Sequence, residues 1–216
     1  MGFALAAPGS AAAATTVGET FDPSAGGNCS PANRTFLQLG PAQYVIPFSG
    51  VLTSWSHQAA ASPPELNLTV ARHQTGNDYL IVGHSSAESP ALNTLNTYAT
   101  RIPVEPGDVI GLHTQTLGQC FLFTDATYQW TSLDGDDPAP GTVVTFGPPA
   151  PNARFDIAAR LEPDADRDGF GDETQDQCST NASIQSPCPV KKKKCKHKRR
   201  HKRAVVVSKK CKKKHH

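Results

Sequence analysis

The sequence predicts an all-β protein: a jelly-roll-like antiparallel β-sandwich, followed by an irregular calcium loop and a disordered basic tail. Three observations lead to this fold class. Apolar and β-branched runs of five to eight residues recur between Pro, Gly, Asn and Asp, as expected for short strands joined by turns. Apolar and polar residues alternate along several of these runs, and no window longer than ten residues carries a helical stripe.

Alternation is strictest in two runs, 66–72 and 154–159, which we expect to be strands with one buried and one exposed face. Residues 104–112 have the pattern of a turn that leads into a buried strand, a phrase common in jelly-roll-like modules. Short strands at regular spacing are typical of a sandwich or a barrel. The predicted strands are 35–39, 44–47, 50–57, 66–72, 79–84, 96–102, 109–114, 120–124, 142–146 and 154–161.

Shifts in composition divide the chain into four segments. Residues 1–16 are small and apolar and contain the cleavage pattern Ala12-Ala13-Ala14, so we interpret them as the remnant of a signal peptide; a disordered N-terminus is the alternative. Residues 17–161 are the predicted sandwich, 162–190 a calcium segment and 191–216 the tail. No other run approaches the 18 apolar residues of a membrane span. We therefore expect a secreted or cell-envelope-associated protein with no integral membrane segment.

An acidic ladder between residues 164 and 178 is the most informative stretch. Aspartates at alternate positions repel one another unless a cation lies between them, and calcium takes six to eight oxygen ligands. A tight loop can direct ligands from its positions 1, 3, 5, 7 and 9 to one point, with glycine at the sixth position, here Gly169. A plain acidic linker is the alternative. The predicted Ca²⁺ ligands are Asp164, Asp166, Asp168, the Phe170 carbonyl and Asp172.

The ladder, its glycines and the cysteine that follows at Cys178 resemble a bacterial thrombospondin type 3 repeat, present here as one copy of about fifteen residues. The resemblance implies that successive aspartates wrap calcium. One extra residue lies between Asp172 and Asp176, so either Gln175 or Asp176 could be the closing ligand, and Ser179 replaces the usual proline. A single loop without a bidentate closing glutamate should bind calcium weakly, with a Kd of roughly 10⁻⁴–10⁻³ M.

Six cysteines lie in three local pairs, which suggests the disulfides Cys29–Cys120, Cys178–Cys188 and Cys195–Cys211. Six cysteines allow fifteen pairings, so the spacing alone does not decide among them. Zinc binding is the rival interpretation, but no Cys-x-x-Cys motif occurs. An even cysteine count agrees with export to an oxidising compartment.

Charge is segregated along the chain. Six arginines face 19 acids before residue 191, a net charge of −13, whereas residues 191–216 carry 15 lysines and arginines and no acid. Such a block attracts polyanions, and in an exported protein these are anionic cell-wall or extracellular polymers. Nucleic acid is an unlikely partner because stacking aromatics are missing, and neutralisation of the acidic body is the alternative role. The expected contacts are Lys191, Lys192, Lys193, Lys194, Lys196, Lys198, Arg199, Arg200, Lys202 and Arg203.

The chain as a whole resembles secreted, uncharacterised proteins of high-GC Gram-positive bacteria, on the phrases at 50–57 and 101–111 and the acidic loop before a lysine-rich end. This resemblance implies secretion, a sandwich and calcium, and supplies no activity. We expect Trp55 in the core and Trp130 as the better candidate for a glycan contact. We assign no catalytic residue. A rival function is a secreted hydrolase, which two or more of the four histidines 57, 73, 84 and 113 beside a carboxylate would favour.

Overall fold

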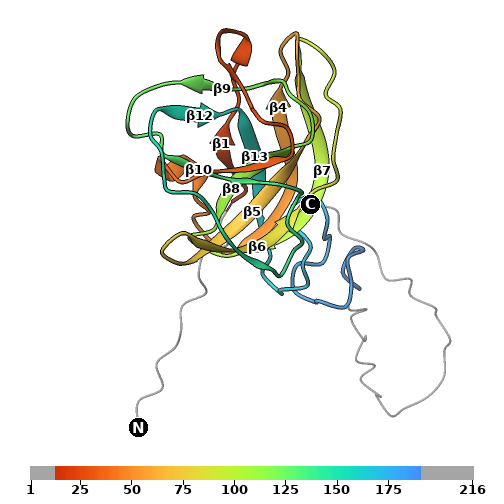
Figure 1. Cartoon of the computed structure of the whole chain (residues 1–216). Helices are drawn as coiled ribbons and strands as arrows, with labels where there is room; N and C mark the ends of the chain where they lie inside the picture. Colours follow the sequence, from red (N-terminus) through yellow and green to blue (C-terminus); the bar gives the residue numbers. More distant parts are fainter. Residues whose placement is uncertain (1–12, 191–216) are drawn as a thin grey trace, which may run out of the picture.

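The computed structural model describes residues 13–190, which form two packed antiparallel sheets and a small third one (Figure 1). The first sheet has the order β1 (Thr15–Glu19), β13 (Ile157–Pro163), β4 (Gly50–Gln58), β7 (Leu95–Val104). The second has the order β10 (Trp130–Asp134), β3 (Arg34–Gln38), β8 (Val109–Thr114), β5 (Leu66–Thr75), β6 (Asp78–His84), β11 (Val143–Thr145). The third consists of β12 (Ala153–Phe155), β9 (Gln119–Phe123) and β2 (Gly27–Asn28).

The strand order confirms a jelly-roll-like sandwich. The chain passes repeatedly from one large sheet to the other, and the first and last strands, β1 and β13, lie side by side. Every strand pair is antiparallel. Two 3-10 turns, η1 (Pro23–Ala25) and η2 (Ala42–Tyr44), are the only helical elements in the part of the chain that the structure describes. None of its helices is long and apolar enough to cross a membrane.

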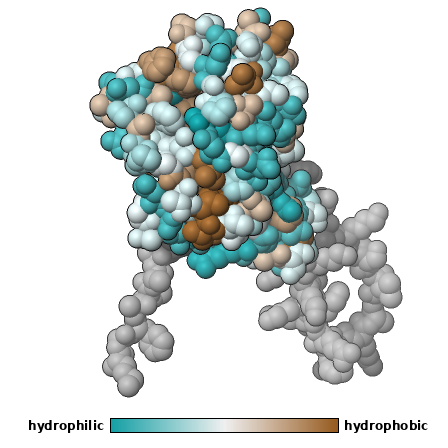
Figure 2. Space-filling view, in the orientation of Figure 1, coloured by the Kyte–Doolittle hydropathy of each residue, from teal (hydrophilic) through white to brown (hydrophobic). Residues whose placement is uncertain are grey.

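The main core lies between the two large sheets, where alternate residues of each strand point inward. Trp55, expected in the core, is fully buried there and lies 4.9 Å from Tyr98, measured between ring centroids. A second apolar cluster covers part of the outer face of the six-stranded sheet, and it includes Leu37, Ile81 and Phe146. Polar side chains cover most of the face that Figure 2 shows, with apolar side chains gathered in small patches. The sandwich therefore has apolar packing on both faces of its larger sheet.

Most predicted strands are confirmed with shifted ends, and four differences are informative. Residues 44–47 were predicted as a strand, which is wrong: Tyr44 is the last residue of η2, and the residues after it make only the single β-bridge Val45–Val109. The sequence analysis missed β2 and β10. It also missed β1, which begins at Thr15, so the boundary drawn after residue 16 falls inside a strand.

The predicted strand 154–161 is two strands that belong to different sheets. β12 ends at Phe155 and pairs with β9, whereas β13 begins at Ile157 and pairs with β1 and β4. Asp156 stands at the change, and its carboxylate accepts hydrogen bonds from the backbone N–H groups of Phe21 (3.0 Å) and Gln58 (2.9 Å). These bonds pair the side-chain oxygens of Asp156 in the interior, so the chain can change sheets at a buried residue.

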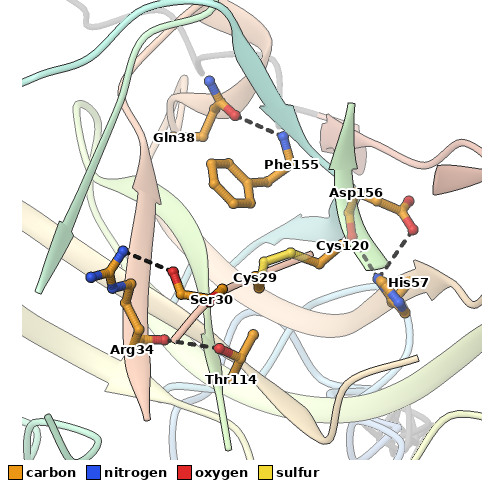
Figure 3. The surroundings of a disulfide bond; sticks show 9 residues. All are labelled: Cys29, Ser30, Arg34, Gln38, His57, Thr114, Cys120, Phe155 and Asp156. Carbon is orange, nitrogen blue, oxygen red and sulfur yellow. Dashed lines mark hydrogen bonds and ion pairs between the residues drawn. A yellow bond between two sulfur atoms is a disulfide. The ribbon is translucent and has the colours of Figure 1, made fainter. Parts of the chain in front are cut away.

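The disulfide Cys29–Cys120 is confirmed, with both residues fully buried and their Cα atoms 5.9 Å apart (Figure 3). It ties the segment after β2 to β9, next to the ring of Phe155 in the core (Figure 3). Cys178–Cys188 is confirmed as well. The predicted pair Cys195–Cys211 lies outside the described residues.

Removal of the buried bridge should destabilise the sandwich. In the chain-entropy model, a crosslink that closes 91 residues contributes roughly 4–5 kcal/mol to the free energy of unfolding. We expect Cys29→Ala/Cys120→Ala to lower the free energy measured by urea unfolding by about that amount. Cys178→Ala/Cys188→Ala is the matched control, because it opens a loop outside the sandwich and should leave the unfolding of the sandwich nearly unchanged. Equal losses in both variants would contradict the prediction.

Candidate metal centre

A buried glutamate anchors the acidic segment to the sandwich. Glu162, near the end of β13, is fully buried. Its Oε1 accepts hydrogen bonds from Thr53 Oγ1 (3.0 Å), Arg160 Nε (2.9 Å) and Thr174 Oγ1 (2.9 Å). Its Oε2 accepts from the backbone N–H groups of Glu173 (3.1 Å) and Thr174 (2.9 Å). The segment that follows is therefore folded back against the end of the sandwich, where Gln175 reaches the carbonyl of Thr100 on β7 (Figure 1).

The five donors decide the charge state of Glu162. Burial by itself raises the pKa of this carboxyl, but hydrogen bonds from Arg160, Thr174 and Thr53 outweigh it, and the net pKa is lowered. Glu162 is thus ionised, and its five hydrogen-bond donors offset the free-energy cost of burying the charge. A Cβ on Gly171 would lie 2.6 Å from Glu162 Oε2, so the close approach of the segment requires glycine at this position.

The acidic ladder folds as a compact loop around its own carboxylates. Asp164 accepts hydrogen bonds from the backbone N–H groups of Asp168 (3.1 Å) and Gly169 (2.9 Å). Gly169 has a φ of +83°, a conformation that glycine adopts without strain. One carboxylate oxygen from each of Asp164, Asp166 and Asp168 lies within 4.8 Å of the others. The predicted loop positions 1, 3 and 5 are therefore brought together.

Three carboxylate oxygens in this loop, on Asp166 and Asp176, have no hydrogen-bond partner although water does not reach them. Asp176 is 3% exposed; its Oδ1 accepts a hydrogen bond from Cys178 N (2.8 Å), and its Oδ2 has no partner. Both carboxylate oxygens of Asp166 are likewise shielded and unpartnered. Burial and the nearby carboxylates of Asp168 and Asp176 raise the pKa of Asp166. A carboxylate oxygen that neither water nor a donor reaches is costly, and a cation among these three oxygens would offset their repulsion and supply the contacts that they lack.

The structure separates the two candidates for the closing ligand. The amide of Gln175 is used elsewhere: Oε1 accepts from Gly171 N (3.3 Å) and Nε2 donates to Thr100 O on β7 (2.9 Å). Asp176 has a carboxylate oxygen without a hydrogen-bond partner, so the geometry favours Asp176 as the closing ligand. Gln175 instead links the segment to the sandwich. The Phe170 carbonyl accepts no hydrogen bond from any described residue, which leaves it available as a ligand.

The remaining predicted ligand, Asp172, also lies in the cluster. Burial raises its pKa, and the carboxylates of Asp164, Asp166 and Asp176 add to the rise. Its two carboxylate oxygens lie 3.3 and 3.1 Å from the backbone nitrogen of Ala165. The carboxylates of Asp172 and Asp176 therefore add negative charge near the group formed by Asp164, Asp166 and Asp168, an arrangement that favours a nearby cation.

The residues between Cys178 and Cys188 contact the acidic loop through Gln185. Gln185, inside the excursion, donates from Nε2 to Asp168 Oδ2 (2.8 Å), and its carbonyl accepts from Gln177 N (3.0 Å). Sequence reasoning identified the disulfide but missed both Gln185 and Glu162. A lone glutamine or glutamate carries no spacing signal, because its role depends on contacts that only the folded chain supplies.

The four histidines occupy three different surroundings. His57 is fully buried beside Asp156, with Nδ1 3.1 Å from the carboxylate oxygen Oδ2 (Figure 3). Burial raises the pKa of Asp156 to about 8 and lowers that of His57. His73 lies edge-on to the ring of Tyr79. His84 and His113 lie on the outer face of the six-stranded sheet, near a carboxylate of the β10–β11 connection.

The predicted glycan contact Trp130 is less accessible than expected. It lies half-buried on β10, and its ring packs against Phe36 and Phe155 at centroid distances of 5.9 and 5.8 Å. A hollow of about 520 Å³ lies instead between the acidic loop and the ends of β4 and β7. Its lining combines Asp164 and Asp168 of the loop with Arg72, Arg167 and other residues.

Comparisons with known proteins give no match, whether to a family model, to a curated protein or to a solved structure. The resemblance to thrombospondin type 3 repeats therefore stands on residues 164–178 alone. The functional argument depends on the chemistry of the chain's own side chains.

Loss of the Glu162 charge should loosen the acidic segment. In Glu162→Gln one end of the side chain carries hydrogens, so it cannot accept the bonds that both carboxylate oxygens accept now. Hydrogen bonds to a charged group contribute about 1.5–3 kcal/mol, so we expect the Thr174 amide to exchange with solvent at least roughly tenfold faster. Hydrogen exchange read by NMR measures this rate. Glu173→Gln, at a more exposed carboxylate that also pairs with Arg160, is the control; unchanged exchange in Glu162→Gln would contradict the assigned role.

Proposed function

We propose that this protein is a secreted calcium-binding β-sandwich protein, held at anionic cell-envelope polymers by its basic tail. The observation that supports calcium most directly is the buried, unpartnered Oδ2 of Asp176 beside the two unpartnered oxygens of Asp166. Hydrogen-bond donors of the fold satisfy the other carboxylates, whereas these oxygens face a cluster of like charge. A bound cation supplies what the loop lacks.

The donor set favours calcium over other cations. The candidate ligands are Asp164, Asp166, Asp168, Asp172 and Asp176, with the Phe170 carbonyl, and all of them offer oxygen. Hard oxygen ligands in a flexible loop of high coordination number suit Ca²⁺, whereas zinc and copper favour nitrogen or sulfur. When bound, the ion would supply charge neutralisation and hold the loop, while Glu162 fixes the loop to the sandwich.

Two disulfides support the extracellular part of the proposal, because such bonds persist in oxidising compartments. The acidic loop directly precedes the tail, so a calcium-ordered loop would set where the tail leaves the sandwich. A glycan or matrix ligand would fit the hollow beside the loop, whose lining mixes acidic and basic side chains with Ser49.

The alternative of a secreted hydrolase is favoured by one observation, the approach of His84 and His113 to Asp137. The other alternative, a nucleic-acid binder that acts through the tail, gains no support.

Calcium titration tests the metal centre. We expect the full chain to bind one Ca²⁺ with a Kd of roughly 10⁻⁴–10⁻³ M in calorimetry. The heat should disappear in Asp166→Ala/Asp168→Ala and weaken at least about tenfold in Asp176→Asn, which leaves Gln175 intact. Asp134→Asn changes an exposed aspartate on β10 and serves as the control. Saturable binding that survives in Asp166→Ala/Asp168→Ala would refute the site.

Deletion of residues 191–216 tests the tether. The full chain should bind isolated bacterial cell walls at low salt and dissociate as salt screens the charges. The shortened chain has lost 15 positive charges and should remain in solution in a sedimentation assay. Equal sedimentation of both proteins would show that the tail is not the anchor, without any bearing on the calcium site.

A further inference from the structure

A polar row crosses the outer face of the six-stranded sheet, at the end that the apolar cluster of that face leaves free. In the strand register Thr35 on β3 lies opposite His113 on β8, and His113 lies opposite Asn67 on β5. One step along, Thr69 on β5 lies opposite His84 on β6. All except His84 are at most 2% exposed. Two imidazoles thus flank a short polar stretch of β5.

A carboxylate from the β10–β11 connection covers this row. Asp137 Oδ2 accepts a hydrogen bond from Asn67 Nδ2 (2.8 Å) and lies 3.5 Å from His84 Nδ1. The second distance is close to the spacing of two ligands that share one ion at about 2.0–2.1 Å each. Asn67 orients the carboxylate. The side chain of His84 is 31% exposed, and its Nδ1 also lies 3.2 Å from the Ser85 carbonyl oxygen.

Three shielded polar atoms in this cluster have no partner: Asn67 Oδ1, Thr69 Oγ1 and Asp137 Oδ1. Buried polar atoms are almost always paired, and an unpaired one costs the full loss of its hydration. Two of the three are acceptors only, and one belongs to a carboxylate. The cluster therefore has an excess of acceptors that a cation would balance.

His113 has the surroundings of a metal ligand. Its Nδ1 lies 3.0 Å from Thr35 Oγ1, an interaction that fixes the ring and leaves Nε2 for another partner. Burial lowers the pKa of His113, and the nearby His84 lowers it too. The carboxylates of Asp137 and Asp136 act in the opposite direction, but the net pKa is lowered. His113 therefore lies within electrostatic reach of Asp137, the carboxylate that covers the row.

We propose that His84, His113 and Asp137, with the amide oxygen of Asn67, bind a divalent transition-metal ion of the zinc class. Two imidazole nitrogens and a carboxylate suit zinc and its neighbours and suit calcium poorly, so this centre is chemically distinct from the acidic loop. Among the described residues, only Asp164, Asp166 and Asp168 have three ligand atoms within 4.8 Å. Binding at the polar row therefore includes a rotation of His84 or a shift of the connection that carries Asp137.

The location of the ion is tested by crystals of the full chain soaked with Zn²⁺ in the presence of calcium. Anomalous scattering at the zinc edge should place a peak between His84, His113 and Asp137. Calcium fills the acidic loop in this experiment, so a peak there does not count for the proposal. A zinc-soaked crystal with peaks only at other histidines or cysteines would overturn it.

Stoichiometry in solution gives a second readout. In competition with a chromophoric chelator, Asp137→Asn and His84→Ala should each bind one zinc ion fewer per chain than the wild type. The test is the difference in bound zinc between each variant and the wild type, not the total, because the tail also contains histidines and cysteines. His73→Ala, at an exposed histidine of β5, should bind the same number as the wild type. If His84→Ala unfolds by circular dichroism, the nearly isosteric Asp137→Asn decides; an unchanged count in a folded Asp137→Asn contradicts the proposal.

Discussion

The place of β13 between β1 and β4 is the constraint on which the other features depend. β13, the last strand of the described residues, pairs along one edge with the first strand, β1, and along the other with β4. The first sheet therefore cannot close until almost the whole sandwich sequence is present, a topology dominated by contacts between distant residues. Buried acidic side chains flank this strand. Asp156 precedes it and accepts hydrogen bonds from the backbone N–H groups of Phe21 and of Gln58, the last residue of β4, while Glu162 near its end accepts bonds from the acidic segment.

Four carboxylates of this small protein are almost inaccessible to water, and their partners distinguish structural from functional groups. Asp108 accepts two bonds from Arg72 and one from Glu105 N. Asp156 and Glu162 are supplied by backbone N–H groups and nearby side chains. Asp176, 3% exposed, has only one of its two oxygens paired. Since burial of an unpaired carboxylate oxygen is unfavourable, Asp176 is the one of the four whose surroundings support the proposed cation site.

The sequence predicted those features whose signal lies in local spacing. Alternation identified most of the strands, cysteine positions gave both described disulfides, and the aspartate ladder located three carboxylates that the fold brings together. Period-two patterns cannot reveal a change of sheet, so 154–161 read as one strand although Asp156 divides it. Choosing Asp176 over Gln175, and finding His84 beside Asp137, required tertiary contacts, because these pairs depend on how distant strands align. β1 was hidden because its small residues continue the composition of the segment before it.

The bond between Gln185 and Asp168 would link the oxidation state of Cys178 and Cys188 to the proposed binding of a cation in the acidic loop. While Cys178–Cys188 is closed, the excursion that carries Gln185 is held against the loop, and little conformational entropy remains to be lost when the carboxylates converge. Opening the bridge gives that freedom back, so the reduced chain must lose it again on binding. By reciprocity, whatever gathers the aspartates also favours the closed bridge. The Cys178–Cys188 bridge and the proposed cation would thus form cooperatively, each one lowering the entropic cost of the other.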